Sequence, residues 1–278
     1  MRVLITGAGG QLGRELSHSK FIPECDLITL DKAQLNICDE VNLREAIIAI
    51  KPDFIVNCAA FTNLDLAEHE SSNNFSVNFS GVRNLGEVCR DFNVKLIHIS
   101  TDAVFSSAQK KIFSKFDEPC PINEYGRAKS KAEKFLQGNN PNSWVVRTSW
   151  LYGQYGGNFF QSILKSARLH QEIQVITSQY GQPTWSADVA KAISLLLTGV
   201  AEPGVYHAIG QEIRSRLEFA KDIYRLTGSQ EELVNSRADV VGQGIAPRAN
   251  FSILESDSNL AALGWMATSI DQAILKSI

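Results

Sequence analysis

The sequence predicts an α/β protein built on a doubly wound parallel sheet, with a smaller C-terminal lobe. Three observations support this fold class. Short apolar runs alternate with helical stretches in the first half of the chain, a glycine-rich turn joins the first run to the first helix, and the alternation fades after about residue 150. Short apolar strands that alternate with helices are typical of a parallel sheet covered on both faces.

Apolar segments rich in β-branched residues predict strands at Val3–Thr6, Leu27–Leu30, Phe54–Asn57, Leu96–Ser100 and Trp144–Arg147. The stretches between them predict helices at Gln11–Lys20, Val41–Ile50, Asn73–Asn93 and Glu124–Gln137. We expect the crossovers between these strands to be right-handed.

The composition bounds the class of protein. The chain of 278 residues has a net charge of −3, which gives no attraction to nucleic acid or to an anionic membrane surface. Its first residues lack the charged and apolar regions of a signal peptide, so none is expected, and no apolar run reaches transmembrane length. The five cysteines are scattered and form no CxxC pair, so we expect a cytoplasmic protein with free thiols. The histidines lack the spacing of metal ligands, and no metal site is expected.

Three glycines, Gly7, Gly10 and Gly13, follow the first expected strand and open the first expected helix. In this context Gly7 permits a tight turn, Gly10 lets a ligand approach the backbone, and Gly13 allows the helix to pack on the strand. The helix N-terminus, with Gln11 and Leu12, offers free N–H groups to a pyrophosphate. The spacing GxxGxxG is wider in its first gap than GxGxxG, and a plain strand–helix turn is the alternative. We favour dinucleotide binding in a Rossmann fold.

Residues after the second and third strands support this interpretation. Asp31 ends the second strand, where a carboxylate accepts hydrogen bonds from the adenine-side ribose and repels a 2′-phosphate. This favours NADH, but the neighbouring Lys32 softens the preference against NADPH, and both cofactors stay open. Asp39 is a weaker candidate for the adenine amino group. Ala59 and Ala60 would let the cofactor pass close over the backbone.

We therefore assign residues 1–150 to a dinucleotide-binding domain, with residues 177–200 expected to belong to it as well. A helix expected at Ala187–Leu197 would pack back on this domain. The remaining residues, 151–176 and 201–278, are less regular and are assigned to a substrate-binding lobe.

The catalytic candidates lie on the fourth strand and the helix that follows it. Thr101 and Asp102 emerge at the carboxyl end of the strand, where ligands bind in open α/β sheets. Tyr125 and Lys129 are four residues apart on the expected helix and share one face. An ammonium group near a phenol stabilises the phenolate, as does an oxidised nicotinamide ring, and each unit by which the pKa falls corresponds to about 1.4 kcal/mol. Tyr125 would then exchange a proton with a substrate oxygen held by Thr101, and Lys129 would also bind the nicotinamide ribose.

Further segments extend the pattern along the chain: GAGGQLG, VNCAAFTNLDLAE, ISTDAVF, EPCPINEYGRAKSKAE, VVRTSWLYG, GNFF, QYGQPT and PRANFSIL. Together they resemble the extended branch of the short-chain dehydrogenase/reductase superfamily, and most closely its dTDP-4-dehydrorhamnose reductase family. The resemblance implies reduction of the 4-keto group of a nucleotide-linked 6-deoxysugar by NADPH or NADH. The substrate it indicates is dTDP-4-dehydro-L-rhamnose, used in polysaccharide synthesis, with Thr101, Tyr125 and Lys129 in the catalytic roles.

The resemblance also implies a set of substrate contacts, namely Thr101, Asp102, Trp150, Asn158, Gln182 and Arg248. Trp150 would lie against the sugar, and plain core packing of its ring is the alternative. A guanidinium such as that of Arg248 can bind a diphosphate bidentately.

The chain departs from the family pattern at three positions. Ala103 stands where a tyrosine is usual, Ser178 where an acidic residue is common, and Ala249 where a proline is usual. Because the catalytic residues are retained, these departures bear on which sugar is used rather than on the type of reaction.

Two alternatives remain. A nucleotide-sugar epimerase or dehydratase would recycle a bound cofactor, and a non-catalytic subunit would use NADP only to hold its shape. Retention of Tyr125 and Lys129 argues against the second. Relatives in the extended branch often dimerise through helices next to the sheet, so a homodimer is expected.

Overall fold

The computed structural model describes residues 1–22, 24–107, 111–237 and 245–278. A parallel sheet of six strands forms its centre, in the order β11-β6-β4-β3-β1-β2. Its strands are β1 (Arg2–Thr6), β2 (Asp26–Leu30), β3 (Phe54–Asn57), β4 (Lys95–Thr101), β6 (Ser143–Thr148) and β11 (Gly204–His207). The predicted fold class is confirmed, and every strand expected from the sequence is present.

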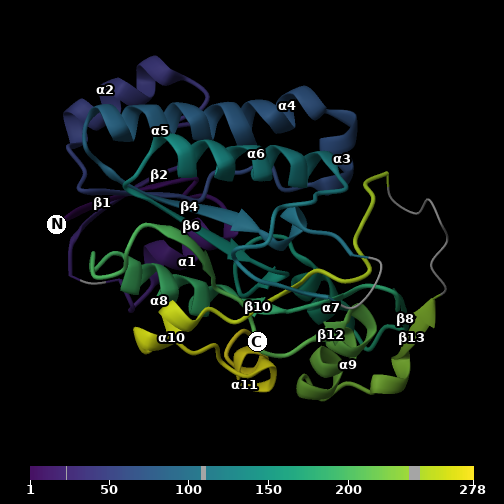
Figure 1. Cartoon of the computed structure of the whole chain (residues 1–278). Coiled ribbons are helices and arrows are strands. Elements are labelled where there is room, and N and C mark those ends of the chain that lie inside the picture. The colour runs from purple at the N-terminus through teal and green to yellow at the C-terminus, as the bar shows by residue number, and fades with distance from the viewer. Residues whose placement is uncertain (23, 108–110, 238–244) are drawn as a thin grey trace.

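Helices cover both faces of this sheet (Figure 1). One face carries α2 (Glu40–Ile50), α5 (Val82–Asp91) and α6 (Glu124–Asn139), with α3 (Leu64–His69) and α4 (Ser71–Phe75) towards one end. The other face carries α1 (Gln11–His18), α8 (Ser186–Leu196) and α10 (Ser258–Ala262). The single helix expected at Asn73–Asn93 is α4 and α5 joined by a π-helical segment, Ser76–Gly81.

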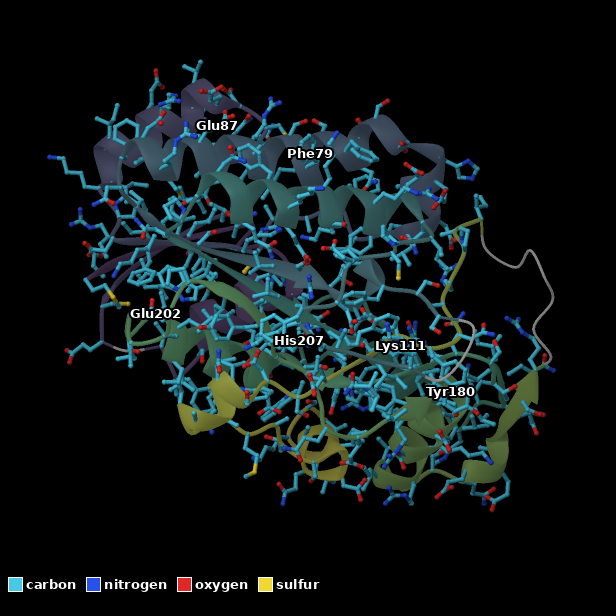
Figure 2. All side chains as sticks on the ribbon, in the orientation of Figure 1. Phe79, Glu87, Lys111, Tyr180, Glu202 and His207 are labelled. Atoms are coloured by element: carbon cyan, nitrogen blue, oxygen red, sulfur yellow. The ribbon has the colours of Figure 1, made fainter. Side chains whose placement is uncertain are left out.

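The alternation of side chains along the strands explains these layers. In β1, Val3 and Ile5 pack with Leu16 of α1, whereas Leu4 packs with Leu43 of α2. Successive strand residues point to opposite faces, so a wholly apolar strand builds a core on each side. Figure 2 shows side chains filling the space between the sheet and the helices on both sides.

A second core holds the smaller lobe together. It is formed by α7 (Phe159–Arg168), α9 (Arg216–Leu226), α11 (Ile270–Leu275), β8 (Ile173–Ile176) and β13 (Val234–Arg237). Short paired segments connect the two parts: β5 (Ile112–Phe113) with β14 (Ile253–Leu254), β7 (Leu151–Tyr152) with β10 (Thr184–Trp185), and β9 (Tyr180–Gly181) with β12 (Arg214–Ser215). Two 3₁₀ turns, Asp102–Val104 and Glu231–Leu233, complete the regular structure of the described ranges.

The structure differs from the sequence-based division at the end of the chain. Strand β11 lies within residues 201–278, which were assigned to the lobe, yet it pairs with β6 at the edge of the central sheet. Leu260 and Trp265 also pack into the core beneath that sheet. The last part of the chain therefore serves both regions, and residues 238–244 of this range lie outside the described part.

The order of the strands reverses between β1 and β3, which creates a crevice where the loops after these strands diverge. Gly7 has a φ of +69°, and a Cβ added to it would lie 2.5 Å from the backbone nitrogen of Ala59. The glycine turn after β1 thus rests directly on the backbone that follows β3. No helix in the described ranges is long and apolar enough to cross a bilayer.

Candidate functional site

A cavity of about 680 Å³ opens at the carboxyl ends of the strands and brings together most of the predicted site residues. Its walls include Gly10, Gln11, Leu12, Ala60, Thr101, Asp102, Tyr125, Lys129, Trp150, Asn158 and Arg248. Gly7, Gly13, Asp31, Asp39, Ala59 and Gln182 are not among its lining residues. The size suits a small-molecule ligand.

The glycine loop shapes one end of this cavity. Gly10 is the N-cap of α1 and has no side chain over the helix N-terminus. A Cβ on Gly13 would lie 2.4 Å from the carbonyl oxygen of Gly7, so only glycine lets α1 start this close to β1. The first residues of α1, Gln11 and Leu12, line the cavity, so the partial positive charge of the helix N-terminus lies where a phosphate could bind.

Two buried polar atoms at the cavity indicate what it binds. Within the described ranges, the amide nitrogen of Gln11 and the hydroxyl of Thr148 are buried and have no hydrogen-bond partner. Buried polar groups normally have partners, so these two fit a polar ligand that enters the cavity. Together with the glycine cradle, these two groups suit a polar ligand such as a dinucleotide.

The two carboxylates expected near the adenosine have structural roles in the fold. Oδ1 of Asp31 accepts hydrogen bonds from the backbone N–H groups of Ala33 and Gln34, at 2.9 and 3.0 Å, and so stabilises the turn after β2. Asp39 is the N-cap of α2, with its side chain accepting from the N–H of Asn42. Asp31 lies next to the glycine loop and stays a candidate for the ribose, because a Cβ on Gly9 would lie 3.6 Å from its Cβ.

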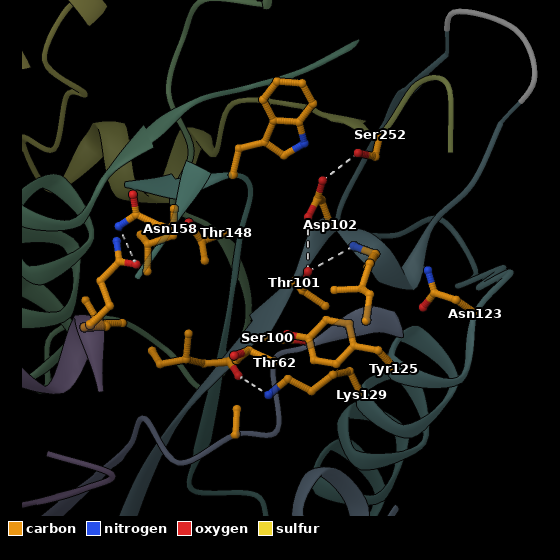
Figure 3. Close-up of a pocket in the computed structure, with 18 of the residues that line it drawn as sticks. Thr62, Ser100, Thr101, Asp102, Asn123, Tyr125, Lys129, Thr148, Asn158 and Ser252 are labelled. Atoms are coloured by element: carbon orange, nitrogen blue, oxygen red, sulfur yellow. Dashed lines mark hydrogen bonds between the residues drawn. The ribbon is translucent and has the colours of Figure 1, made fainter. Parts of the chain in front are cut away.

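Helix α6 brings the catalytic candidates into the cavity. Its N-cap is Asn123, whose side chain accepts from the N–H of Gly126 at 2.7 Å. The backbone of Gly126 packs so tightly on the 3₁₀ turn after β4 that a Cβ would lie 2.2 Å from the carbonyl oxygen of Ala103. Tyr125 and Lys129 consequently extend from one face of α6 into the cavity (Figure 3).

A hydrogen-bonded group surrounds the hydroxyl of Tyr125. This hydroxyl bonds to Thr101, whose own hydroxyl donates to Oδ1 of Asp102 at 3.1 Å. The other carboxylate oxygen of Asp102 accepts from Ser149 at 2.9 Å and from Ser252 at 2.5 Å. Tyr125 and Thr101 therefore present their hydroxyls together, as the donation of a proton to one substrate oxygen requires.

The structure corrects the expectation that Lys129 makes Tyr125 acidic in the free protein. Burial, followed by the nearby Asp102 carboxylate, raises the pKa of the Tyr125 hydroxyl, and the hydrogen bond to Thr101 opposes this only in part. Nζ of Lys129 donates to the backbone oxygen of Ile99 at 2.6 Å. Burial lowers the pKa of Lys129 to about 8. The free protein thus holds Tyr125 as a neutral phenol with a proton to give.

Trp150 lines the cavity and is held in an unusual conformation. Its φ is +43°, which a non-glycine residue rarely adopts. The guanidinium of Arg216 lies 3.5 Å from the centre of its ring, and a Cβ on Gly181 would collide with the indole. The ring is therefore fixed in place at the cavity wall rather than packed in a core, which supports the predicted contact with a ligand.

Arg216 is a cavity residue that the sequence analysis missed. It begins α9, directly after the N-cap Ser215, which forms a capping box with Glu218. Burial lowers the pKa of Arg216 to about 10, and the carboxylate of Asp102 acts in the opposite direction. The capping-box signature was visible in the letters SRLE, but nothing local indicated that this helix begins at the cavity.

The other predicted substrate contacts differ in their surroundings. Asn158 lines the cavity, is the N-cap of α7 and donates to the side-chain oxygen of Gln11 at 3.1 Å. Arg248 lines it too and forms a bidentate ion pair with Asp65, at 3.0 and 2.9 Å. Gln182 instead hydrogen-bonds both backbone groups of Leu254 and so ties the segment between β9 and β10 to β14.

With this geometry in view, comparison with known proteins identifies the family. The RmlD substrate binding domain model matches residues 1–278. The chain belongs to this family.

Individual proteins are similar in sequence to this RmlD-family chain over almost its whole length. A dTDP-4-dehydrorhamnose reductase from Mycolicibacterium smegmatis is 33% identical to this chain, and the match covers 94% of this chain and 80% of the relative. A dTDP-4-keto-6-deoxy-D-glucose reductase from Streptomyces niveus is 32% identical to this chain, and the match covers 98% of this chain and 96% of the relative. The crystal structure of dTDP-4-dehydrorhamnose reductase from Bacillus anthracis in complex with NADP is 32% identical, with a TM-score of 0.92 and coverage of 99% and 98%.

Ala103 also lines the cavity wall, at the position where the resemblance to the reductase family implies a tyrosine. Within the described ranges, no three His, Cys, Asp or Glu side chains gather as metal ligands.

Proposed function

We propose that this chain reduces the 4-keto group of a nucleotide-linked 6-deoxysugar with NADPH or NADH, converting dTDP-4-dehydro-L-rhamnose to dTDP-L-rhamnose. The observation that carries this proposal is the meeting of Tyr125, Thr101 and Lys129 with the glycine loop in one cavity. A proton donor and a dinucleotide cradle at the same place are what a carbonyl reductase needs. The names of the relatives support the substrate, and the NADP in the B. anthracis structure supports the cofactor.

Each of the main cavity residues has a separate role in this reduction. When bound, the reduced nicotinamide supplies a hydride to the keto carbon. Tyr125 gives its proton to the keto oxygen, while the hydroxyl of Thr101 holds that oxygen in place. Lys129, in its ammonium form, stabilises the phenolate that Tyr125 becomes and restores its proton by way of solvent. Trp150 forms a wall for the sugar, and Arg216 and Arg248 supply positive charge for the diphosphate.

The direct test is to mix the protein with dTDP-4-dehydro-L-rhamnose and NADPH or NADH and to follow the loss of nicotinamide absorbance. One equivalent of cofactor should be oxidised for each dTDP-L-rhamnose formed. An epimerase or dehydratase would consume no net cofactor, and a regulatory subunit would bind it without turnover, so either result would contradict the proposal. Running dTDP-4-keto-6-deoxy-D-glucose in parallel tests the sugar preference that the S. niveus relative suggests.

We also propose a cytoplasmic homodimer. Free thiols at all five cysteines support the compartment, because a reducing environment preserves them. The dimer is supported by the resemblance to extended-branch reductases, which often dimerise through helices next to the sheet. Light scattering after size exclusion would report twice the mass of 30.7 kDa, and a monomer at micromolar concentration would contradict this part of the proposal.

A further inference from the structure

A line of buried polar side chains crosses the sheet and ends at Lys129. Thr6, Asn57 and His98 lie side by side on β1, β3 and β4, because the strand registers pair Thr6 with Asn57 and Asn57 with His98. All three are completely buried. The hydroxyl of Thr6 lies 2.8 Å from Oδ1 of Asn57, Nδ2 of Asn57 lies 3.0 Å from Nδ1 of His98, and Nε2 of His98 lies 3.4 Å from Nζ of Lys129.

The backbone determines how the amide of Asn57 is oriented. Its Oδ1 accepts from the backbone N–H of Ala59 at 3.1 Å, as well as from the Thr6 hydroxyl. A backbone N–H can only donate, so the oxygen of the amide must lie on this side and the NH₂ group must face His98. The usual ambiguity between the oxygen and nitrogen of an asparagine amide is removed here by its neighbours.

This orientation in turn determines the tautomer of His98. The NH₂ group of Asn57 donates, so Nδ1 of His98 must accept and carries no proton. Burial, followed by the charge of Lys129, lowers the pKa of His98 far below its usual range, so the ring is neutral. A neutral ring with a bare Nδ1 carries its proton on Nε2. His98 therefore aims an N–H at Nζ of Lys129.

The protonation state of Lys129 decides whether this contact is favourable. An ammonium group has only donors, so the ring N–H and the ammonium would face each other as two donors. A neutral amine has a lone pair that can accept from the ring N–H. The carbonyl of Ile99, which accepts from Nζ, suits both forms and does not distinguish them.

We propose that Asn57 and His98 are positioning residues that favour the neutral amine of Lys129 by presenting a ring N–H to its nitrogen. In the reduction proposed above, on which this consequence rests, the ammonium form supports proton donation by Tyr125. Activity should therefore fall as the pH rises past the point where Lys129 loses its proton, and His98 should bring that point closer to neutrality.

The other groups around Lys129 do not account for this effect. Glu133 of the same helix favours the charged amine, as Cys58 after β3 would if it were a thiolate, and burial opposes the charge. Burial keeps Cys58 a neutral thiol by raising its pKa to about 12. Tyr125 bonds to Thr101 and remains protonated. The ring N–H of His98 is thus the one specific contact described at Nζ that discriminates against the ammonium.

The first experiment needs neither substrate nor cofactor. In ¹⁵N-labelled protein, NMR of the His98 ring reports which nitrogen carries the proton. We expect a proton on Nε2 throughout the neutral range. A proton on Nδ1, or on both nitrogens, would overturn the proposal.

The second experiment is the substitution His98→Asn, with the Lys129 amine titrated by ¹³C NMR. The asparagine oxygen can still accept from Asn57, but no N–H reaches Nζ. The midpoint for Lys129 should move up by about one pH unit. In Thr6→Val, the N–H of Ala59 still orients Asn57, so the midpoint should stay in place. A midpoint unmoved in His98→Asn would show that His98 is merely structural and would overturn the proposal.

The third measurement separates this inference from the proposed reductase function. With dTDP-4-dehydro-L-rhamnose as substrate, the alkaline limit of kcat/KM should rise in His98→Asn by as much as the NMR midpoint. If the protein reduces no keto sugar at all, the proposed function fails while the NMR results still decide the role of His98. If His98→Asn does not fold, the tautomer in the unchanged protein remains decisive.

Discussion

The hydroxyl of Tyr125 illustrates how one residue obtains its chemistry from its surroundings. The sequence predicts a phenol whose pKa is lowered by Lys129 and by an oxidised nicotinamide ring, whereas in the free protein burial and Asp102 keep Tyr125 protonated. A reductase must donate a proton to the keto oxygen, so a protonated phenol is the form that the forward reaction requires. Its acidity needs to rise only when cofactor and substrate fill the cavity.

Replacing this residue gives a direct prediction. Tyr125→Phe removes the proton donor but keeps the ring that packs at the cavity wall, so turnover should fall on the order of a hundredfold or more. The affinity for NADPH should change little, which a fluorescence titration of the cofactor would measure. Turnover close to that of the unchanged protein would instead indicate a regulatory role for the cavity.

At the scale of elements, the start of α6 decides where the candidate catalytic side chains, Tyr125 and Lys129, lie. Asn123 is the N-cap and sets where the helix begins. The close approach of Gly126 to the turn after β4 sets the distance between the helix and Thr101. Tyr125 and Lys129 follow on the same face one turn apart. The position of these two side chains therefore depends on the contact between the backbone of Gly126 and the backbone of Ala103.

Two glycines in this helix provide a matched test. In Gly126→Ala the new Cβ would lie 2.2 Å from the Ala103 carbonyl oxygen, so α6 must shift, with a loss of about 1–3 kcal/mol in stability. Activity should fall further than stability, because Tyr125 moves with the helix. Gly138→Ala, in the same helix, meets nothing within 4 Å and should stabilise the fold by up to about 1 kcal/mol with activity unchanged.

Urea unfolding and the cofactor oxidation assay would measure both effects. Equal behaviour of the two variants would show that the contact between α6 and the turn after β4 does not position the site.

At the scale of the whole molecule, the cavity lies where the sheet, the glycine loop and the smaller lobe meet. Its walls come from distant parts of the chain, from Gln11 near the start to Ser252 near the end. A ligand that joins these parts should stabilise the folded state as a unit.

This predicts a thermal shift on binding. NADPH at about a hundredfold excess over its dissociation constant should raise the unfolding free energy by roughly 2.7 kcal/mol, seen as a Tm increase of several degrees. Adenosine alone should shift the Tm much less, because it lacks the pyrophosphate that the glycine loop and the N-terminus of α1 would bind. The absence of any shift at millimolar NADPH would argue against a dinucleotide site. Scanning fluorimetry would distinguish these cases.

Short-range sequence patterns predict much of the candidate site, and the residues that they do not predict have physical causes in common. Thr101, Tyr125, Lys129 and the glycine loop were predicted because strand ends and helix spacing place them by short-range rules. Arg216 and Thr148 were missed, since each becomes part of the cavity only when a segment far along the chain folds back. Gln182 was assigned to the substrate, yet its amide pairs with the backbone of Leu254, a partner 72 residues away that no local pattern indicates.

By itself, the sequence determined the parallel sheet, its order of strands and helices along the chain, and the residue types available for proton transfer. Periodicity, glycine spacing and helix caps are properties of neighbouring residues and can be read without a fold. Only the tertiary structure decided that β11 completes the sheet, that Tyr125 stays protonated and that Asn57 sets the tautomer of His98. These outcomes depend on burial and on contacts across strands, which exist only once distant segments have packed together.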